Sequence, residues 1–270
     1  MHTEDRLFSR SPKRQSLVSL ASKSGAVQLD MGRNVTDAHM IRWGRLTQLQ
    51  RLCLKGAQVT DAGLADLSGL TKLEVLKLSW TKVTDAGLVN LKDMPILRRL
   101  AVNSTGVCDA GLSHLSQLKS LEFLDLGDTQ VTDIGLANLA HLERLSVLRL
   151  TGTKITDAGL IHLKELSHLR LLDLDSTSVG DAGLLHLSQL RYLEELDLQD
   201  TKVTDDGVKH LSEMTTLKFL FLTNTLVTDA CLAHLDNLTE LTQLDLQLTQ
   251  VTSAGLAEFR KKHPTCDVTN

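Results

Sequence analysis

The chain has 270 residues, of which 42% are apolar but only 3% aromatic, and its formal net charge is −4. A net charge this small gives no general reason to expect a nucleic-acid partner. No apolar run approaches the roughly 18 residues of a membrane-spanning helix, so we expect no membrane partner either.

Residues 1–24 lie outside the pattern that governs the rest of the chain. They carry more basic than acidic side chains. Their apolar stretch at residues 17–21 is shorter than the roughly 7–15 residues of a signal-peptide core. On composition we expect a flexible N-terminal tail. The run RSPKR at residues 10–14 also resembles a phosphorylation or nuclear-import segment, although such short patterns often occur by chance.

From residue 25 onwards, a 24-residue unit repeats ten times, as in LEFLDLGDTQVTDIGLANLAHLER at residues 121–144. Its consensus is L-x-x-L-x-L-x-x-T-x-V-T-D-A-G-L-x-x-L-x-x-L-x-x. Leu124 and Leu126 have the spacing of a half-buried strand, whereas Leu136 and Leu139 have that of a short helical turn. A fixed period of this length predicts a solenoid in which equivalent strands form a parallel sheet and equivalent leucines stack into one core.

Two polar positions of the unit have structural roles in this interpretation. A threonine follows the strand in eight successive units, and we expect its hydroxyl to bond to turn backbone in the next coil. In the Val-Thr-Asp sequence that precedes each helix, either Thr132 or Asp133 can cap the helix by accepting a bond from a free backbone N–H.

The two ends of the array depart from the consensus, as the capping units of a solenoid do. In the irregular first repeat, residues 25–48, His39 replaces the usual glycine. At the other end, residues 257–270 read as a capping half-repeat in which Phe259 replaces a leucine and a final half-strand follows. We therefore expect residues 25–270 to form a single, complete solenoid domain.

The four cysteines occupy unlike positions of the repeat. Cys53 and Cys108 are two coils apart, about 10 Å by strand spacing, which exceeds the roughly 7 Å between Cα atoms that a disulfide allows. Cys231 and Cys266 are similarly separated. We expect free thiols and a reducing, cytoplasmic location.

One helix position is histidine in five units and suggests a metal site. These residues are His114, His162, His186, His210 and His234. Zinc needs its ligand nitrogens about 2 Å from one centre, whereas packed helices lie roughly 8–10 Å apart. We therefore interpret the histidines as a repeated polar position, and we expect no metal and no cofactor.

The L-x-x-L-x-L opening and the V-T-D-A-G-L-x-x-L segment resemble leucine-rich repeats of the ribonuclease-inhibitor-like type. The second segment is similar to the cysteine-containing repeats of F-box/LRR substrate receptors, and more closely to the short-period repeats of uncharacterised bacterial leucine-rich repeat proteins. The resemblance covers residues 25–268. It implies an α/β solenoid shaped as a horseshoe, with a parallel β-sheet on the concave face and short helices on the convex face. The shorter period, and threonine in place of the signature cysteine, set the chain apart from the F-box family.

Strand positions between the core leucines face the concave surface and are free to vary. In early coils they are basic, as at Arg51 and Lys77, and in later coils they are mostly acidic. Phe219 and Phe221 stand side by side on one strand, and exposed paired aromatics suggest a binding site. The candidate protein-binding residues are Trp80, Phe123, Asp173, Asp175, Glu195, Asp197, Phe219, Phe221, Asp245 and Leu248.

A purely structural explanation competes with this binding hypothesis. Asp125, Arg149 and Asp173 stand at equivalent positions of successive strands and could form a cross-strand ion-pair ladder. Asp197, one strand further on, does not fit that explanation, because like charges directly opposite each other destabilise a sheet.

The sequence contains no G-x-S-x-G, P-loop or H-E-x-x-H motif, and we expect no enzymatic activity. The favoured function is a monomeric scaffold that binds a protein partner through its concave face. Two alternatives stay open: the substrate-recognition subunit of a ubiquitin ligase, as the F-box resemblance implies, and a structural array without a dedicated ligand. A ligase role would need a separate adaptor, since residues 1–24 are too few for an F-box.

Overall fold

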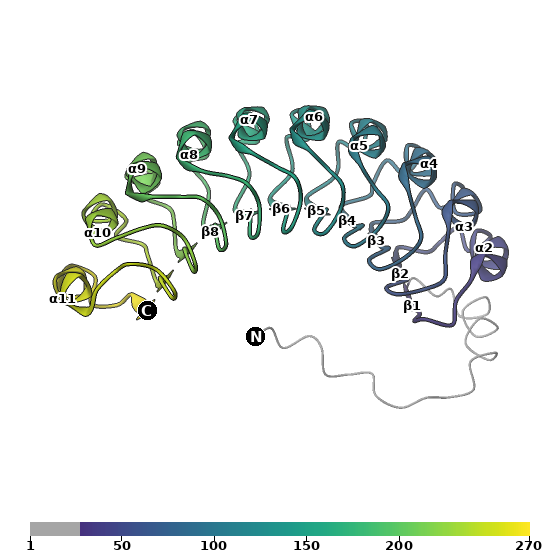
Figure 1. The fold of residues 1–270 in the computed structure, drawn as a ribbon. Coiled ribbons are helices and arrows are strands. Elements are labelled where there is room, and N and C mark those ends of the chain that lie inside the picture. The colour runs from purple at the N-terminus through teal and green to yellow at the C-terminus, as the bar shows by residue number, and fades with distance from the viewer. Residues whose placement is uncertain (1–27) are drawn as a thin grey trace.

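The computed structural model of the chain describes residues 28–270 and shows a curved solenoid (Figure 1). Eleven strands form one parallel sheet whose spatial order is the chain order, from β1 to β11. The strands lie along the inner, concave side of the arc and the helices along its outer side (Figure 1). The predicted α/β horseshoe is confirmed. The tail expected at residues 1–24 lies outside the described residues.

Each coil adds one three-residue strand and one short helix. The strands are β1 (Gln28–Asp30), β2 (Arg51–Cys53), β3 (Val75–Lys77), β4 (Arg99–Ala101), β5 (Phe123–Asp125), β6 (Val147–Arg149), β7 (Leu171–Asp173), β8 (Glu195–Asp197), β9 (Phe219–Phe221), β10 (Gln243–Asp245) and β11 (Asp267–Thr269). The α-helices are α2 (Asp37–Trp43), α3 (Asp61–Ala65), α4 (Asp85–Leu88), α5 (Asp109–Leu115), α6 (Asp133–Leu136), α7 (Asp157–Leu160), α8 (Asp181–Leu187), α9 (Asp205–Val208), α10 (Ala230–His234) and α11 (Ser253–Lys262). Short 3-10 turns extend four of them: η1 (Val89–Leu91), η2 (Ala137–Leu139), η3 (Ile161–Leu163) and η4 (Lys209–Leu211).

One leucine per strand points into the hydrophobic core, away from the concave surface, and stacks on its equivalent in the next coil. Leu124 pairs in register with Leu148, and both side chains are fully buried. The column continues into the final half-strand, where Val268 pairs with Leu244. A coil has no core of its own, so the stacked column is what buries the apolar face of each repeat.

The Val-Thr-Asp sequence joins neighbouring coils as well as capping helices. Thr132 caps α6, because its hydroxyl accepts a bond from the Ile134 N–H at 3.3 Å. The carboxylate of Asp133 accepts two bonds from the next coil, from the Thr156 N–H at 2.8 Å and the Thr156 hydroxyl at 2.6 Å. Of the two caps that the sequence left open, the structure selects the threonine.

This contact between coils recurs along the array, and we call it the Asp–Thr ladder. Its pairs are Asp37–Thr60, Asp61–Thr84, Asp85–Cys108, Asp109–Thr132, Asp133–Thr156, Asp157–Gly180, Asp181–Thr204, Asp205–Thr228 and Asp229–Thr252. Cys108 keeps both contacts through its N–H and thiol, whereas Gly180 offers only its N–H. The ladder supplies acceptors for backbone donors at the helix starts, which would otherwise lack partners.

The ladder explains the glycine of each D-A-G-L segment. A Cβ on Gly159 would lie 2.4 Å from Asp133 Oδ1, so the carboxylate of one coil occupies the side-chain space of the next. Cys231 stands in the glycine position beside Asp205, and there α10 begins one residue later than its counterparts, at Ala230. Burial, reinforced by Asp205 and Asp229, raises the pKa of the Cys231 thiol to about 12. All four cysteines of the chain are unpaired.

The threonine after each strand bonds within its own coil. The Thr153 hydroxyl donates to the Leu150 carbonyl at 2.5 Å, and the same bond occurs in all eight units. The expectation of a bond to the next coil is wrong. The turn after the strand folds the chain back, so each threonine hydroxyl lies next to the backbone carbonyl three residues earlier. It bonds to that carbonyl and not to the backbone of the next coil.

Candidate functional site

The concave face carries the side chains on either side of each core leucine. On β9, Leu220 is fully buried while Phe219 and Phe221 are half-buried. The two phenylalanines therefore lie on the sheet surface and not in the core, as the sequence register predicted.

The strand register brings most of the candidate residues together on β7 to β10. Asp197 on β8 pairs in register with Asp173 on β7 and with Phe221 on β9. Phe221 in turn pairs with Asp245 on β10. Glu195 faces Phe219. We call this group the acidic–aromatic surface. It comprises Asp173, Asp175, Glu195, Asp197, Phe219, Phe221 and Asp245.

Three of the candidate residues lie elsewhere. Phe123 is on β5, where the Arg99 guanidinium lies 4.3 Å and the Arg149 guanidinium 5.7 Å from its ring centroid, so its ring makes cation–π contacts within the chain. Trp80 and Leu248 lie in the turns after β3 and β10, with 59% and 78% of their surface exposed. Their φ angles of 62° and 57° are left-handed, a conformation that bulky residues rarely adopt.

The carboxylate of Asp197 is the most strongly perturbed acid of the concave face. It accepts bonds from the Gln199 N–H and side-chain amide, at 3.1 and 3.0 Å. Burial nevertheless raises the pKa of Asp197 to about 6, and the nearby Asp173 and Asp175 add to the shift. A carboxyl group with this pKa is held partly desolvated beside other negative charges.

The acidic character extends further than the candidate residues from the sequence. Burial also raises the pKa of Asp125, with contributions from Asp173 and Asp128, and that of Asp175, with contributions from Asp173 and Asp200. Asp125, Asp128 and Asp200 were absent from the candidate set. Asp128 and Asp200 occupy the left-handed turn position, where aspartate is common for backbone reasons, so an aspartate at this position does not by itself indicate a second role.

The proposed ion-pair ladder of Asp125, Arg149 and Asp173 does not form. The three residues do face one another in register. Within residues 28–270, however, Arg149 makes no ion pair within 4.0 Å with either aspartate. Asp173 instead accepts the Thr151 hydroxyl at 2.7 Å. The carboxylates of this region therefore keep a net negative charge facing the concave side.

The flank of the solenoid carries the ion pairs that the concave face lacks. Arg98 pairs with Glu122 at 2.6 Å, and Glu194 accepts from both Arg170 and Lys218 at 3.1 Å. These residues come just before their strands and alternate in charge from coil to coil. Such alternation stabilises the stacking modestly and leaves little net charge for a partner.

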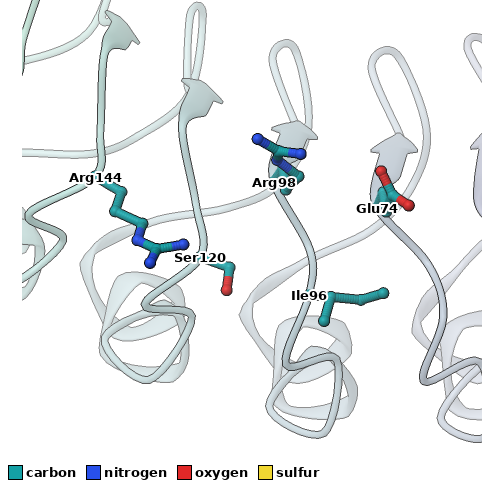
Figure 2. A pocket seen from close by; sticks show the side chains of 5 residues that line it. All are labelled: Glu74, Ile96, Arg98, Ser120 and Arg144. Atoms are coloured by element: carbon teal, nitrogen blue, oxygen red, sulfur yellow. The ribbon is translucent and has the colours of Figure 1, made fainter.

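A shallow pocket of about 340 Å³ lies beside these ion pairs, where segments lead into neighbouring strands (Figure 2). It is lined by Glu74, Ile96, Arg98, Ser120 and Arg144. The Arg98 guanidinium is already paired, and the Ser120 hydroxyl donates to the Pro95 carbonyl at 2.8 Å. The pocket therefore offers no free nucleophile next to a base.

Two other types of site find no support between residues 28 and 270. No group of three or more His, Cys, Asp or Glu side chains in this range is arranged to hold a metal ion. No helix in the same range is long and apolar enough to cross a membrane.

Comparisons with known proteins agree with the observed architecture. The family model described as "Leucine Rich repeat" matches residues 69–92, 117–140 and 189–212. No curated protein sequence matches the chain.

Two solved internalin structures from Listeria monocytogenes strain 4b F2365 are similar to this chain. Internalin inlF is 25% identical, with a TM-score of 0.75 over 94% of this chain and 76% of its own. Internalin C2 (inlC2) is 24% identical, with a TM-score of 0.59 over 76% of this chain and 83% of its own, and this second likeness concerns the fold alone. The ribonuclease-inhibitor-like subtype and the F-box resemblance are supported by neither structure and stay predictions. The repeated unit, the parallel concave sheet and these matches show that the chain contains leucine-rich repeats stacked in a leucine-rich repeat solenoid.

Proposed function

We propose that the chain is a non-catalytic scaffold that binds a protein partner through its concave sheet, at the acidic–aromatic surface. The partner would present an apolar side chain to Phe219 and Phe221, with lysine or arginine side chains towards the neighbouring carboxylates. Leucine-rich repeat folds, including the internalin fold matched here, typically serve as interaction scaffolds, which supports the general part of the proposal.

The observation that carries the proposal is the pairing of Asp173 with Asp197. The two aspartates face each other on adjacent strands, and neither has a cationic partner within ion-pair distance in the described part of the chain. Like charges placed opposite each other reduce the stability of a sheet. Both carboxylates accept hydrogen bonds within the chain, but these donors are neutral and leave the like charges opposed, whereas a cationic partner would relieve the repulsion.

The surface also has the physical make-up of an interaction site. Half-buried aromatic side chains near the centre of an interface typically contribute about 2 kcal/mol or more to binding. A rim of carboxylates raises the association rate of a basic partner and makes binding sensitive to salt. The four unpaired cysteines support a reducing location such as the cytoplasm, and we propose a monomer as the binding form.

The proposal is tested by affinity capture with the full chain as bait, followed by quantitative mass spectrometry. Replacing Phe219 and Phe221 by serine removes the aromatic anchor and leaves Leu220 in the core. We expect the partner captured by the parent protein to be lost from this double variant, at roughly 30-fold lower affinity if the anchor contributes about 2 kcal/mol. Circular dichroism melting of the variant must match the parent.

A matched control sits at the other end of the same face. Arg51→Ala with Lys77→Ala removes two exposed charges from β2 and β3, and we expect it to retain the partner. If the serine variant binds within a factor of about three of the parent while this control abolishes binding, the partner uses the early coils. If neither variant affects capture, the partner binds elsewhere on the chain and the proposed site is wrong. If the parent captures no partner, the chain is better described as a structural array.

A further inference from the structure

We propose that a basic segment of this same chain, residues 6–23, docks on the acidic–aromatic surface and occupies it until a partner displaces it. The proposal rests on the surface described under the proposed function, and it adds a built-in competitor to that surface. Residues 6–23 come before the described residues 28–270, so the proposed occupant is part of the same chain and not a second molecule.

Charge complementarity is the first argument. The concave side of β5 to β8, together with the first three residues after each strand, combines seven carboxylates with one guanidinium, that of Arg149. The carboxylates belong to Asp125, Asp128, Asp173, Asp175, Glu195, Asp197 and Asp200. Residues 6–23 contain five basic side chains and no acidic one. The basic residues are Arg6, Arg10, Lys13, Arg14 and Lys23.

Apolar complementarity is the second argument. Two large apolar residues, Leu7 and Phe8, precede the basic cluster at residues 10–14, so a chain that runs from β1 over the acidic coils reaches them last, next to β9. The surface offers Phe219 and Phe221, half-buried and next to the carboxylates in register. A segment with this composition can therefore satisfy the carboxylates and cover the rings at the same time.

The length of the segment is sufficient. Between Gln28 on β1 and Arg14 there are 28 − 14 = 14 residue steps, which span about 46 Å when extended at roughly 3.3 Å per residue. The seven strand steps from β1 to β8 span roughly 34 Å at about 4.8 Å each. The arc curves towards the concave side (Figure 1), so the straight path is shorter still.

Apart from Lys23, which comes shortly before β1 in the sequence, the order of charges along the segment also matches the order along the sheet. A chain running from β1 towards β8 first crosses the basic coils, where Arg51, Lys55 and Lys77 are exposed. Residues 15–22, QSLVSLAS, carry no charge and would cross this region without repulsion. The cluster at residues 10–14 would then lie over the acidic coils.

Docking within one molecule is favoured over docking between copies. A short tether gives an effective concentration of about a millimolar, well above ordinary protein concentrations. A peptide that binds the free surface weakly, at about 100 μM, would therefore be excluded roughly tenfold by the tethered copy.

The experiment measures binding of a fluorescent synthetic peptide, residues 1–24, by fluorescence anisotropy. The titrated proteins are the full-length parent and a full-length variant in which Arg6, Arg10, Lys13 and Arg14 are glutamine. We expect the variant to bind the peptide about tenfold more tightly than the parent, because its own segment no longer competes. Adding Phe219→Ser and Phe221→Ser to the variant should abolish peptide binding.

A charge-matched control removes four lysines that lie away from the concave face. Lys92, Lys164, Lys209 and Lys261 are exposed within or at the ends of η1, η3, η4 and α11, on the outer side of the arc, and replacing them with glutamine should leave peptide affinity at the parental value. If the peptide binds the parent and the tail variant equally, or binds neither, the cis docking is wrong. Light scattering adds a further check: a parental mass that rises with concentration and becomes monomeric in the tail variant would show docking onto a second copy and would also overturn the proposal.

The outcome is separable from that of the proposed function. If the peptide fails to bind while an external partner still depends on Phe219 and Phe221, only the cis docking is overturned. If neither ligand depends on the two rings, both proposals fail. If both depend on them, the tail variant should capture the external partner about tenfold more tightly than the parent.

Discussion

Aspartates form two regular groups in this solenoid, and their surroundings differ in a way that separates folding from recognition. In the Asp–Thr ladder, a carboxylate such as Asp133 receives two hydrogen bonds from the next coil. On the concave face, Asp173 faces Asp197 with no cation between them. Hydrogen bonds from Thr252 lower the pKa of the ladder residue Asp229, whereas burial raises that of Asp197 to about 6.

The difference shows how a repeat protein can use one residue type for two purposes. A ladder carboxylate finds its donors inside the chain and strengthens the stacking of coils. The concave carboxylate of Asp197 receives its hydrogen bonds from Gln199 of its own coil and is disfavoured in its charged form, so it does less to join coils and would gain from an external cation. Stability measurements on matched substitutions can therefore assign each aspartate to one group.

The largest expected effect comes from removing a ladder carboxylate. Asp133→Ala leaves the Thr156 N–H and hydroxyl without their acceptor, and we expect the free energy of unfolding to fall by about 2–3 kcal/mol. Asp197→Ala removes the same atoms from the concave face and should cost clearly less, because the bonds from Gln199 lie within one coil and the like charge beside Asp173 is removed. Urea denaturation followed by circular dichroism compares the two. Equal losses would show that the two groups of aspartates do not differ in role.

The second prediction tests the close contact between a ladder carboxylate and the glycine of the next coil. Gly159→Ala places a Cβ 2.4 Å from Asp133 Oδ1, and we expect a loss of about 1–3 kcal/mol. In an Asp133→Ala background the same substitution should cost clearly less, so the double-mutant cycle shows coupling. Gly32→Ala is the control, since nothing lies within 4 Å of its added Cβ. Additive losses would mean that the carboxylate is not what excludes the side chain.

The contributions of the two groups of aspartates to folding stability should also change with pH in opposite directions. The folded-state pKa of Asp197 is raised to about 6, so the folded protein binds this proton more readily than the unfolded chain does. Stability contributed by Asp197 therefore rises as pH falls from 7 towards 4. Asp197→Asn should remove that rise, on the order of 1 kcal/mol once partial solvent screening is included.

Asp229 is the matched residue of opposite behaviour. Its pKa is lowered, so its contribution is present above the unfolded value of about 3.9 and is lost as pH falls through the folded value. Melting temperatures of the parent, Asp197→Asn and Asp229→Asn across pH 3 to 7 provide the measurement. An Asp197→Asn profile parallel to that of the parent would contradict the raised pKa.

The smallest effect is a gain in stability from completing the ladder. Gly180 donates only its N–H to Asp157, and a Cβ there would meet Asp157 Oδ2 at an ordinary contact distance of 3.5 Å. Gly180→Thr supplies the missing hydroxyl and a better helix cap, and we expect a gain of about 0.5–1 kcal/mol. A lower melting temperature in this variant would show that the site departs from the threonine pattern for steric reasons.

The sequence was sufficient to predict the features that follow from the repeat period, although not the threonine bond, which lies within one coil. Leu124 and Leu148 repeat at a period that only a stacked solenoid can bury, so the sheet, its register and the half-buried position of Phe219 followed directly. The pairing of Val268 with Leu244 shows that the same reasoning holds at the irregular C-terminal end.

Features that depend on contacts between repeats were harder to predict. Val-Thr-Asp is a good helix-start signal in any protein, and only the stacking geometry shows that Asp133 bonds to Thr156 in the next coil. Phe123 and Phe219 are both phenylalanines at the same position of their strands, but the strands next to β5 place Phe123 between two guanidinium groups. The sequence does not reveal such neighbours until the register and side-chain directions are known.

The 24-residue period shared by the repeats affects how this protein can evolve. Excising residues 133–156 would join Thr132 directly to Asp157, and Asp157 would still reach Gly180 while Asp109 would still reach Thr132. A whole coil can thus be lost or duplicated by recombination with the same kinds of contact re-forming between the coils that become neighbours. Two outward positions per strand remain free to mutate independently of that process. Length and specificity can therefore evolve separately, the first by copying units and the second by single substitutions.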